Sequence, residues 1–99
     1  MKTKDQLFVG SPHAVSRLVG ETMVLLDLST DKYFGLPNAG ARMWELLSEG
    51  ATLIRVADVI ASEYEVAREQ AHHDAQKLAA KLVEAGLLLP VSSAESTSE

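Results

Sequence analysis

The sequence contains no cysteine, which excludes disulfides, thiolate zinc sites, iron–sulfur clusters and cysteine nucleophiles. The absence of cysteine also suits a reducing compartment. Long hydrophobic runs are missing as well, because the longest unbroken one, residues 86–91, is far shorter than the roughly 20 residues that cross a bilayer. The first residues lack the apolar stretch of a signal peptide. We therefore expect a soluble, cytoplasmic protein with no membrane partner.

Positive charge is scarce, since nine Lys and Arg residues stand against 14 Asp and Glu residues, for a net charge of −5. Nucleic-acid binding depends on Lys and Arg that displace counterions from phosphates, so we expect no nucleic-acid partner.

The six glycines form no Gly-x-Gly-x-x-Gly or Walker pattern. His72 and His73 are adjacent and would point about 100° apart on a helix, which prevents joint chelation of one metal. The sequence predicts a protein that is not an enzyme, with no cofactor, metal or catalytic residue.

The composition is that of one globular domain. Hydrophobic residues make up 46% of the chain, which is typical of globular proteins and not of disordered ones. A length of 99 residues leaves room for a single hydrophobic core. Residues 92–99 contain only Ser, Thr, Ala and Glu. We expect a disordered tail there, behind a domain of residues 1–91.

Three short antiparallel strands are predicted at residues 13–19, 23–28 and 33–36. The polar residues 29–32 form the second turn, and Asp27 is placed to cap it through a side-chain bond to the backbone. No later segment stands in an obvious position to pair with the outer edge of the third strand. An unpaired aromatic edge strand is either an aggregation hazard or a docking site for an extended peptide.

Three helices are predicted after Pro37. The first ends at Gly50, the second begins at the N-cap Thr52, and the third covers residues 67–85. Glu45, Glu49 and Glu63 occupy exposed helical positions and are interpreted as surface charge. The inward faces are Gly40, Met43, Trp44 and Leu47 in the first helix, Leu53, Val56, Ala57, Ile60 and Tyr64 in the second, and Ala71, Ala75, Leu78, Leu82 and Ala85 in the third.

Two apolar segments lie outside these elements. Residues 7–9 either pair or pack, and residues 87–90 either close the core or form a last edge strand. The order of the other elements, a three-stranded antiparallel sheet followed by three helices, predicts an α+β fold of the winged-helix-like type.

The ordered set of short motifs between residues 20 and 88 resembles the PqqD-like family of leader-peptide recognition domains. The matching elements are the Val-Leu-Leu-Asp strand that ends at Asp27, the aromatic strand at residues 33–36, and the Gly-x-x-hydrophobic-Trp-x-Leu-Leu helix at residues 40–47. Members of the family bind the leader of a ribosomally made precursor peptide between the third strand and the third helix. This chain departs from the family at Leu36-Pro37-Asn38, where members usually have Leu-Asn.

The resemblance implies a leader-binding site on those two elements. The third helix carries Ala75 and Ala79 where the family usually has bulky residues, which suggests either close packing or the floor of a groove. Lys77 and Lys81 are interpreted first as a solvated face, and otherwise as partners of acidic leader residues. The predicted contact residues are Lys32, Tyr33, Phe34, Gly35, Leu36, Ala75, Gln76, Leu78, Ala79, Lys81, Leu82 and Val83.

The main hypothesis is a non-enzymatic peptide-binding chaperone. It captures a precursor leader by strand addition at the third strand and presents it to a separate maturation enzyme, either a leader peptidase, as in lasso-peptide pathways, or a radical-SAM enzyme, as in PQQ biosynthesis. One alternative is a winged-helix DNA-binding protein. Another is an adaptor or homodimer that uses the same sheet edge. The hypothesis allows a monomer or a weak dimer.

Overall fold

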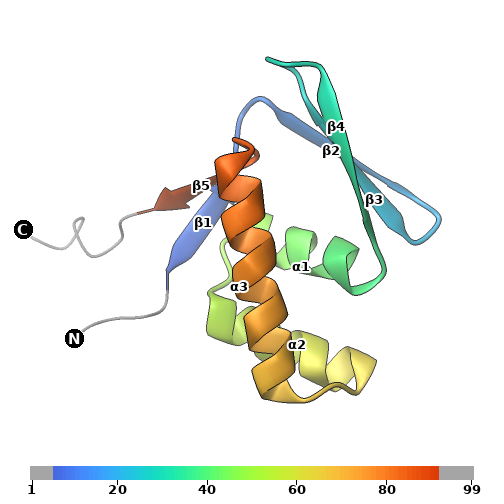
Figure 1. The fold of residues 1–99 in the computed structure, drawn as a ribbon, viewed down its shortest axis with the longest axis vertical. Helices are drawn as coiled ribbons and strands as arrows, with labels where there is room; N and C mark the ends of the chain where they lie inside the picture. Colours follow the sequence, from blue (N-terminus) through green and yellow to red (C-terminus); the bar gives the residue numbers. More distant parts are fainter. Residues whose placement is uncertain (1–5, 92–99) are drawn as a thin grey trace, which may run out of the picture.

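The computed structural model describes residues 6–91, and two small sheets lie on different sides of its third helix (Figure 1). The expected tail, residues 92–99, lies outside the described residues. The elements are, in chain order, β1 (Leu7–Gly10), β2 (Ala14–Val19), β3 (Thr22–Asp27), β4 (Lys32–Pro37), α1 (Ala39–Ser48), α2 (Leu53–Tyr64), α3 (Arg68–Glu84) and β5 (Leu88–Val91).

The larger sheet is antiparallel with the order β2-β3-β4, so β3 lies in the middle. Along β3, the buried residues Met23, Leu25 and Asp27 alternate with half-buried ones, because successive side chains of a strand point to opposite faces. This sheet and the three helices that follow it confirm the predicted α+β fold. The predicted third strand is β4, and it extends by one residue at each end.

The smaller sheet joins the two ends of the described chain. Strands β1 and β5 pair antiparallel, with Phe8 opposite Pro90. Phe8, Leu87 and Leu88 are buried in the core. Both apolar segments therefore pair with each other and pack on the core, and residues 7–9 belong to a strand, β1.

The helices begin and end near the predicted residues. Thr52 caps α2 by accepting a hydrogen bond from the backbone N–H of Arg55 at 3.1 Å. Gly50 has a φ of 101°, a conformation that favours glycine and ends the α1 segment. The core contains most of the predicted inward residues of each helix, namely Met43, Trp44, Leu47, Leu53, Val56, Ala57, Ile60, Ala71, Ala75 and Leu82. Gly40, Leu78 and Ala85, also predicted to face inward, are half-buried.

One prediction about the second helix is wrong. Tyr64 was expected on the inward face, but it is 40% exposed because α2 ends there and Glu65 takes a left-handed φ of 56°. Glu63 is exposed, as predicted, and both of its carboxylate oxygens accept hydrogen bonds from Arg42, at 3.1 and 3.2 Å.

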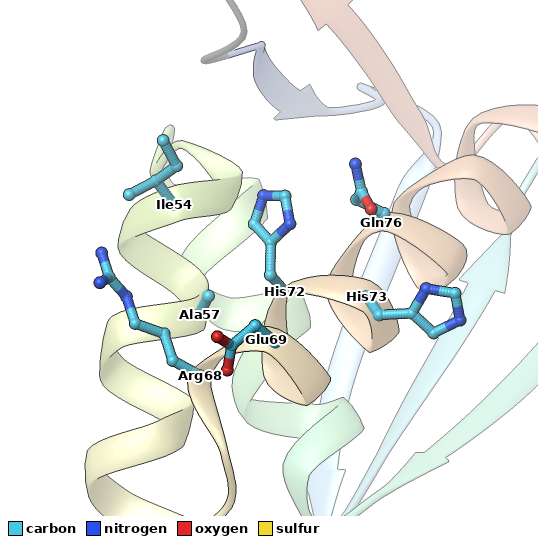
Figure 2. A pocket seen from close by; sticks show the side chains of 7 residues that line it. All are labelled: Ile54, Ala57, Arg68, Glu69, His72, His73 and Gln76. Atoms are coloured by element: carbon cyan, nitrogen blue, oxygen red, sulfur yellow. The ribbon is translucent and has the colours of Figure 1, made fainter.

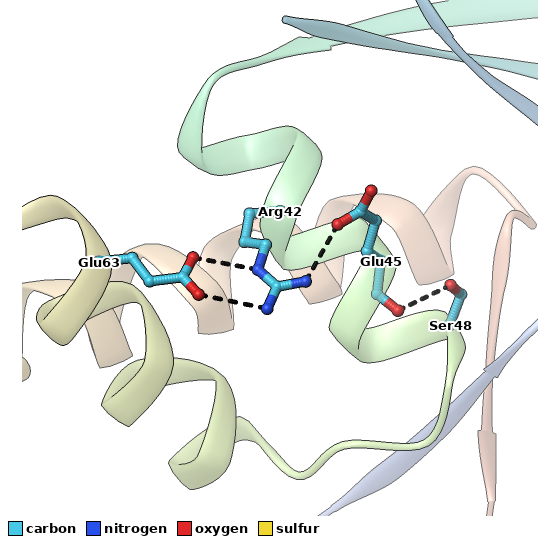
Figure 3. A network of polar contacts seen from close by, with 4 residues as sticks. All are labelled: Arg42, Glu45, Ser48 and Glu63. Carbon is cyan, nitrogen blue, oxygen red and sulfur yellow. Dashed lines mark hydrogen bonds and ion pairs between the residues drawn. The ribbon is translucent and has the colours of Figure 1, made fainter.

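Arg42 connects α1 to α2 (Figure 3). Its third contact is with Glu45 at 3.1 Å, and Glu45 is half-buried, not exposed as predicted. The two carboxylates raise the pKa of Arg42 above its ordinary value, Glu63 more than Glu45. The bidentate geometry fixes the angle between the helices more firmly than a single ion pair. Of these two helices, α1 is the one that packs on β4.

Candidate functional site

Strand β4 is an edge strand of the larger sheet, and its two aromatic side chains point to opposite faces. Tyr33 is 74% exposed, whereas Phe34 is half-buried and packs against the core. This confirms that one aromatic residue packs inward and the other faces solvent. Leu36 is buried, and Lys32 and Gly35 are exposed. One face of β4, with Phe34 and Leu36, therefore packs on the core, and the other face, with Tyr33 and Gly35, is exposed.

The turn before β4 is held by Asp27, as predicted. Its Oδ1 accepts hydrogen bonds from the hydroxyl of Ser29 at 2.7 Å and from the backbone N–H of Ser29 at 3.0 Å. Its carbonyl oxygen accepts from the N–H of Asp31 at 2.8 Å. The Ser29 bonds, the hydroxyl first, lower the pKa of Asp27 below its ordinary value. Asp27 therefore fixes where the return strand begins.

The backbone groups of β4 have a defined direction. In antiparallel strands, the residues alternate between those that bond to the neighbouring strand and those that bond away from it. The N–H of Asn38 donates to the carbonyl of Glu21 at 2.8 Å, so Asn38 faces the β3 side. Counting back in twos, Leu36, Phe34 and Lys32 also face β3, and Pro37, Gly35 and Tyr33 face the free edge.

A second hydrogen bond gives the same result from the other side of the sheet. The N–H of Leu28 donates to the carbonyl of His13 at 2.9 Å, so Leu28 faces β2. Alternation along β3 then leaves Leu25 to face β4, opposite Phe34. The free edge of β4 therefore presents the N–H and C=O groups of Tyr33 and Gly35.

Strand β2 forms a second open edge, for which no binding role was predicted. The residues of β2 that face away from β3 are Ala14, Ser16 and Leu18. The N–H of Ala14 is bound to the carbonyl of Ser11 at 3.0 Å, so Ser16 and Leu18 carry the available donors. Because both edges offer backbone donors, side chains must decide which edge a peptide prefers.

The small residues of α3 lie in the core. Ala75, Ala79 and Leu82 are 0%, 2% and 1% exposed, respectively. Ala57 of α2 is buried as well, at 1% exposed, and α2 and α3 pack closely on one another. Small side chains on both helices allow that close approach. The burial of these alanines fits close packing of α3 on α2.

The other predicted residues of α3 divide between two sides of this buried stripe. Helical spacing places Leu78 and Lys81 on one side and Gln76 and Val83 on the other. Leu78 is half-buried and packs on the same core as Phe34. Gln76 and Val83 line, together with Ala79, a cavity of about 550 Å³ whose other walls include residues of β1 and β5, and no residue of β4 lines it.

A second cavity, of about 430 Å³, lies between α2 and α3 and is lined by Ile54, Ala57, Arg68, Glu69, His72, His73 and Gln76. Figure 2 shows the rings of His72 and His73 pointing in different directions.

In the part of the chain from residue 6 to residue 91, no group of three or more His, Asp or Glu side chains is placed to hold a metal ion. Within the same residues, no helix has the length and apolar character needed to cross a bilayer.

Comparisons with known proteins match this architecture to one family. A chain described as TbiB1 in complex with the TbiA(beta) leader peptide is 36% identical, with a TM-score of 0.75 over 81% of this chain and 93% of that one. A lasso peptide synthetase B1 complexed with the leader peptide is 34% identical, with a TM-score of 0.76 over 84% and 98%. The comparison with curated proteins gives no match. The family model of coenzyme PQQ synthesis protein D (PqqD) matches residues 22–88. The chain belongs to the PqqD family, as the resemblance in its sequence implied.

Proposed function

We propose that this chain is a non-enzymatic recognition module that captures the leader of a ribosomally made precursor peptide by strand addition along β4. The observation that carries the proposal is the open edge of β4, where Tyr33 and Gly35 offer backbone donors and acceptors to an extended chain. Two solved relatives that share the fold and about a third of the sequence are complexes with leader peptides.

Side chains must supply much of the affinity. Ordering a disordered leader costs about 2–5 kcal/mol of the gross interaction free energy, and a short edge returns only a few hydrogen bonds. Tyr33 offers an exposed aromatic surface on one side of the edge, and Phe34 with Leu78 offers a partly buried apolar surface near the other. Lys81 stands exposed on the Leu78 side of α3, where it suits an acidic leader residue.

The proposal includes a separate maturation enzyme to which the captured leader is presented. Binding both the peptide and the enzyme raises the effective concentration of the substrate at the enzyme. Both solved relatives come from leader-peptide systems, and one is described as a lasso peptide synthetase. This favours a lasso-type precursor and a leader peptidase over a radical-SAM enzyme.

A fluorescence-anisotropy titration tests the proposal. Labelled leader segments of the short peptides encoded beside this gene are titrated with the protein, together with a labelled DNA duplex and a scrambled leader. Saturable binding of one leader, with no binding of its scrambled form, is the expected result. If the duplex binds with a steep salt dependence and no leader binds, the protein is a winged-helix DNA-binding protein instead.

Concentration-dependent mass in the absence of any leader provides the other test. A monomer that stays monomeric at the concentrations where the leader saturates is expected. A dimer that dissociates when the leader is added indicates that the same edge is shared. A dimer that persists, with no leader bound, favours the adaptor hypothesis.

A further inference from the structure

We infer that Pro37 ends the hydrogen-bonding edge of β4 and thereby limits a bound leader to two complete backbone pairs, at Tyr33 and Gly35. This inference rests on the proposed function, because it concerns the same edge. It starts from the position of Pro37, which lies opposite Thr22 in the sheet and faces the free edge. At that position proline breaks no bond to β3, and it offers an incoming strand a carbonyl but no N–H.

The opposite end of the edge is closed by the turn. Asp31 has a left-handed φ of 62°, and its N–H is already bound to the carbonyl of Asp27 at 2.8 Å. Between Asp31 and Pro37, the outward donors are therefore those of Tyr33 and Gly35. A complete hydrogen-bonded pair with an incoming strand requires both the N–H and the C=O of an outward residue. Such pairs form at Tyr33 and Gly35 and nowhere else between those ends.

A short edge with two closed ends limits how much of a leader can pair. When an extended strand shifts by two residues, other residues of that strand take the places opposite Tyr33 and Gly35, so the number of backbone hydrogen bonds stays the same. A shift by one residue turns every leader side chain to the other face of the sheet, so the leader side chains set the register. Pro37 therefore limits the length of the paired segment without contacting leader side chains.

The residue after Pro37 keeps the sheet intact. Asn38 returns its N–H to Glu21 at 2.8 Å and then becomes the N-cap of α1, with a φ of 54° and no side-chain cap bond. The inserted proline of the Leu36-Pro37-Asn38 segment thus lies at the outward position just before α1 begins. Replacement of Pro37 would add an outward donor without removing an existing bond.

The test compares wild type, Pro37→Ala and the control Pro12→Ala, with the same leader segments as probes. Pro12 is exposed in the loop before β2 and contributes nothing to the β4 edge. We expect Pro37→Ala to bind the leader roughly two- to tenfold more tightly, the effect of one added hydrogen bond, and Pro12→Ala to bind as wild type does. Amide hydrogen exchange, followed by NMR, should show leader-induced protection at Tyr33 and Gly35, and at residue 37 in the variant.

The outcomes separate this inference from the proposed function. Leader binding with protection at Tyr33 and Gly35, but no gain in affinity and no protection at residue 37 in the variant, would overturn the role of Pro37 and leave leader capture intact. Leader binding without protection at Tyr33 would overturn both the proposed edge and the role of Pro37. No binding of any leader would remove the proposed function itself. If Pro37→Ala is misfolded, Pro37→Val adds the same donor with a residue that favours strands.

Discussion

The backbone N–H of Asn38 lies 2.8 Å from the carbonyl oxygen of Glu21, and this bond defines which groups of β4 face the solvent. It belongs to the residue next to Pro37, just beyond the end of the strand. Because hydrogen bonding alternates along an antiparallel pair, the backbone N–H and C=O of Gly35 face the free edge and those of Phe34 face β3. A bond made by Asn38 therefore identifies the outward backbone groups, although Asn38 lies three residues beyond Gly35.

The first prediction uses the two open edges as mutual controls. Gly35→Pro and Ser16→Pro each remove one outward N–H, from β4 and β2 respectively, and edge strands tolerate proline at such positions. We expect Gly35→Pro to weaken leader binding by at least about fivefold, because an unpaired leader carbonyl costs roughly 1–3 kcal/mol. Ser16→Pro should bind as wild type does. Anisotropy titrations measure both affinities.

Gly35→Ala separates the lost N–H from the added side chain. A Cβ at position 35 would meet the Cγ2 atom of Thr22 at 3.6 Å, an ordinary contact, so the alanine variant should fold normally. If it binds as poorly as the proline variant, the leader needs the space above Gly35 more than its N–H. If only Ser16→Pro weakens binding, the peptide adds to β2, and the proposed edge is wrong.

The second prediction concerns Tyr33. This side chain is 74% exposed, so Tyr33→Ala should change the free energy of unfolding by no more than about 0.5 kcal/mol. Loss of an aromatic anchor typically costs more than about 1 kcal/mol of binding free energy, so the leader should bind at least about fivefold more weakly. Tyr64→Ala, a change at the end of α2, is the matched control. Equal affinities of the two variants would show that Tyr33 contributes nothing.

Phe34 is a poorer probe than the sequence suggests. It is half-buried and packs against the core, so a charged substitution there would lower stability as well as binding. Its effect on a titration would be ambiguous. The exposed neighbour Tyr33 avoids this difficulty because it is separated from the core by the sheet itself.

The third prediction distinguishes close packing from a groove on α3. Ala75 is fully buried, and Ala80 on the same helix is exposed. Overpacking a core typically costs about 1–3 kcal/mol, so Ala75→Leu should lower the free energy of unfolding by that amount. Ala80→Leu should change it by no more than about 0.5 kcal/mol. Urea denaturation measures both, and a stable Ala75→Leu protein that no longer binds a leader would instead support the groove.

Local signals explain which parts of the fold were predictable. The strand predicted at residues 23–28, the cap at Thr52 and the glycine at the end of α1 each depend on a few neighbouring residues, and all three are confirmed. The pair of Arg42 with Glu63 was missed because the partners are 21 residues apart and no sequence pattern connects them. A strand pattern gives the faces of side chains, but the direction of backbone donors depends on the register of the turn. The unusual Pro37 was visible in the sequence, and its outward position was not.

The last prediction follows from Asp27. Hydrogen bonds from Ser29 hold the pKa of this carboxyl below its ordinary value of 3.8, so the ionised form stabilises the folded protein. A depressed pKa gives a contribution that is fully present above the unfolded-state pKa and is lost as the pH falls through the folded-state pKa. The stability advantage of wild type over Asp27→Asn should therefore be constant from neutral pH to about 5 and shrink below about 4.

Urea denaturation at a series of pH values measures this difference directly. Ser29→Ala removes the hydroxyl donor but keeps the backbone N–H, so its pH dependence should lie between those of wild type and Asp27→Asn. An advantage that grows as the pH falls would contradict the assigned direction of the pKa shift. Because the same turn begins β4, leader binding in wild type should weaken over the same acidic range, and binding by Asp27→Asn should depend less on pH there.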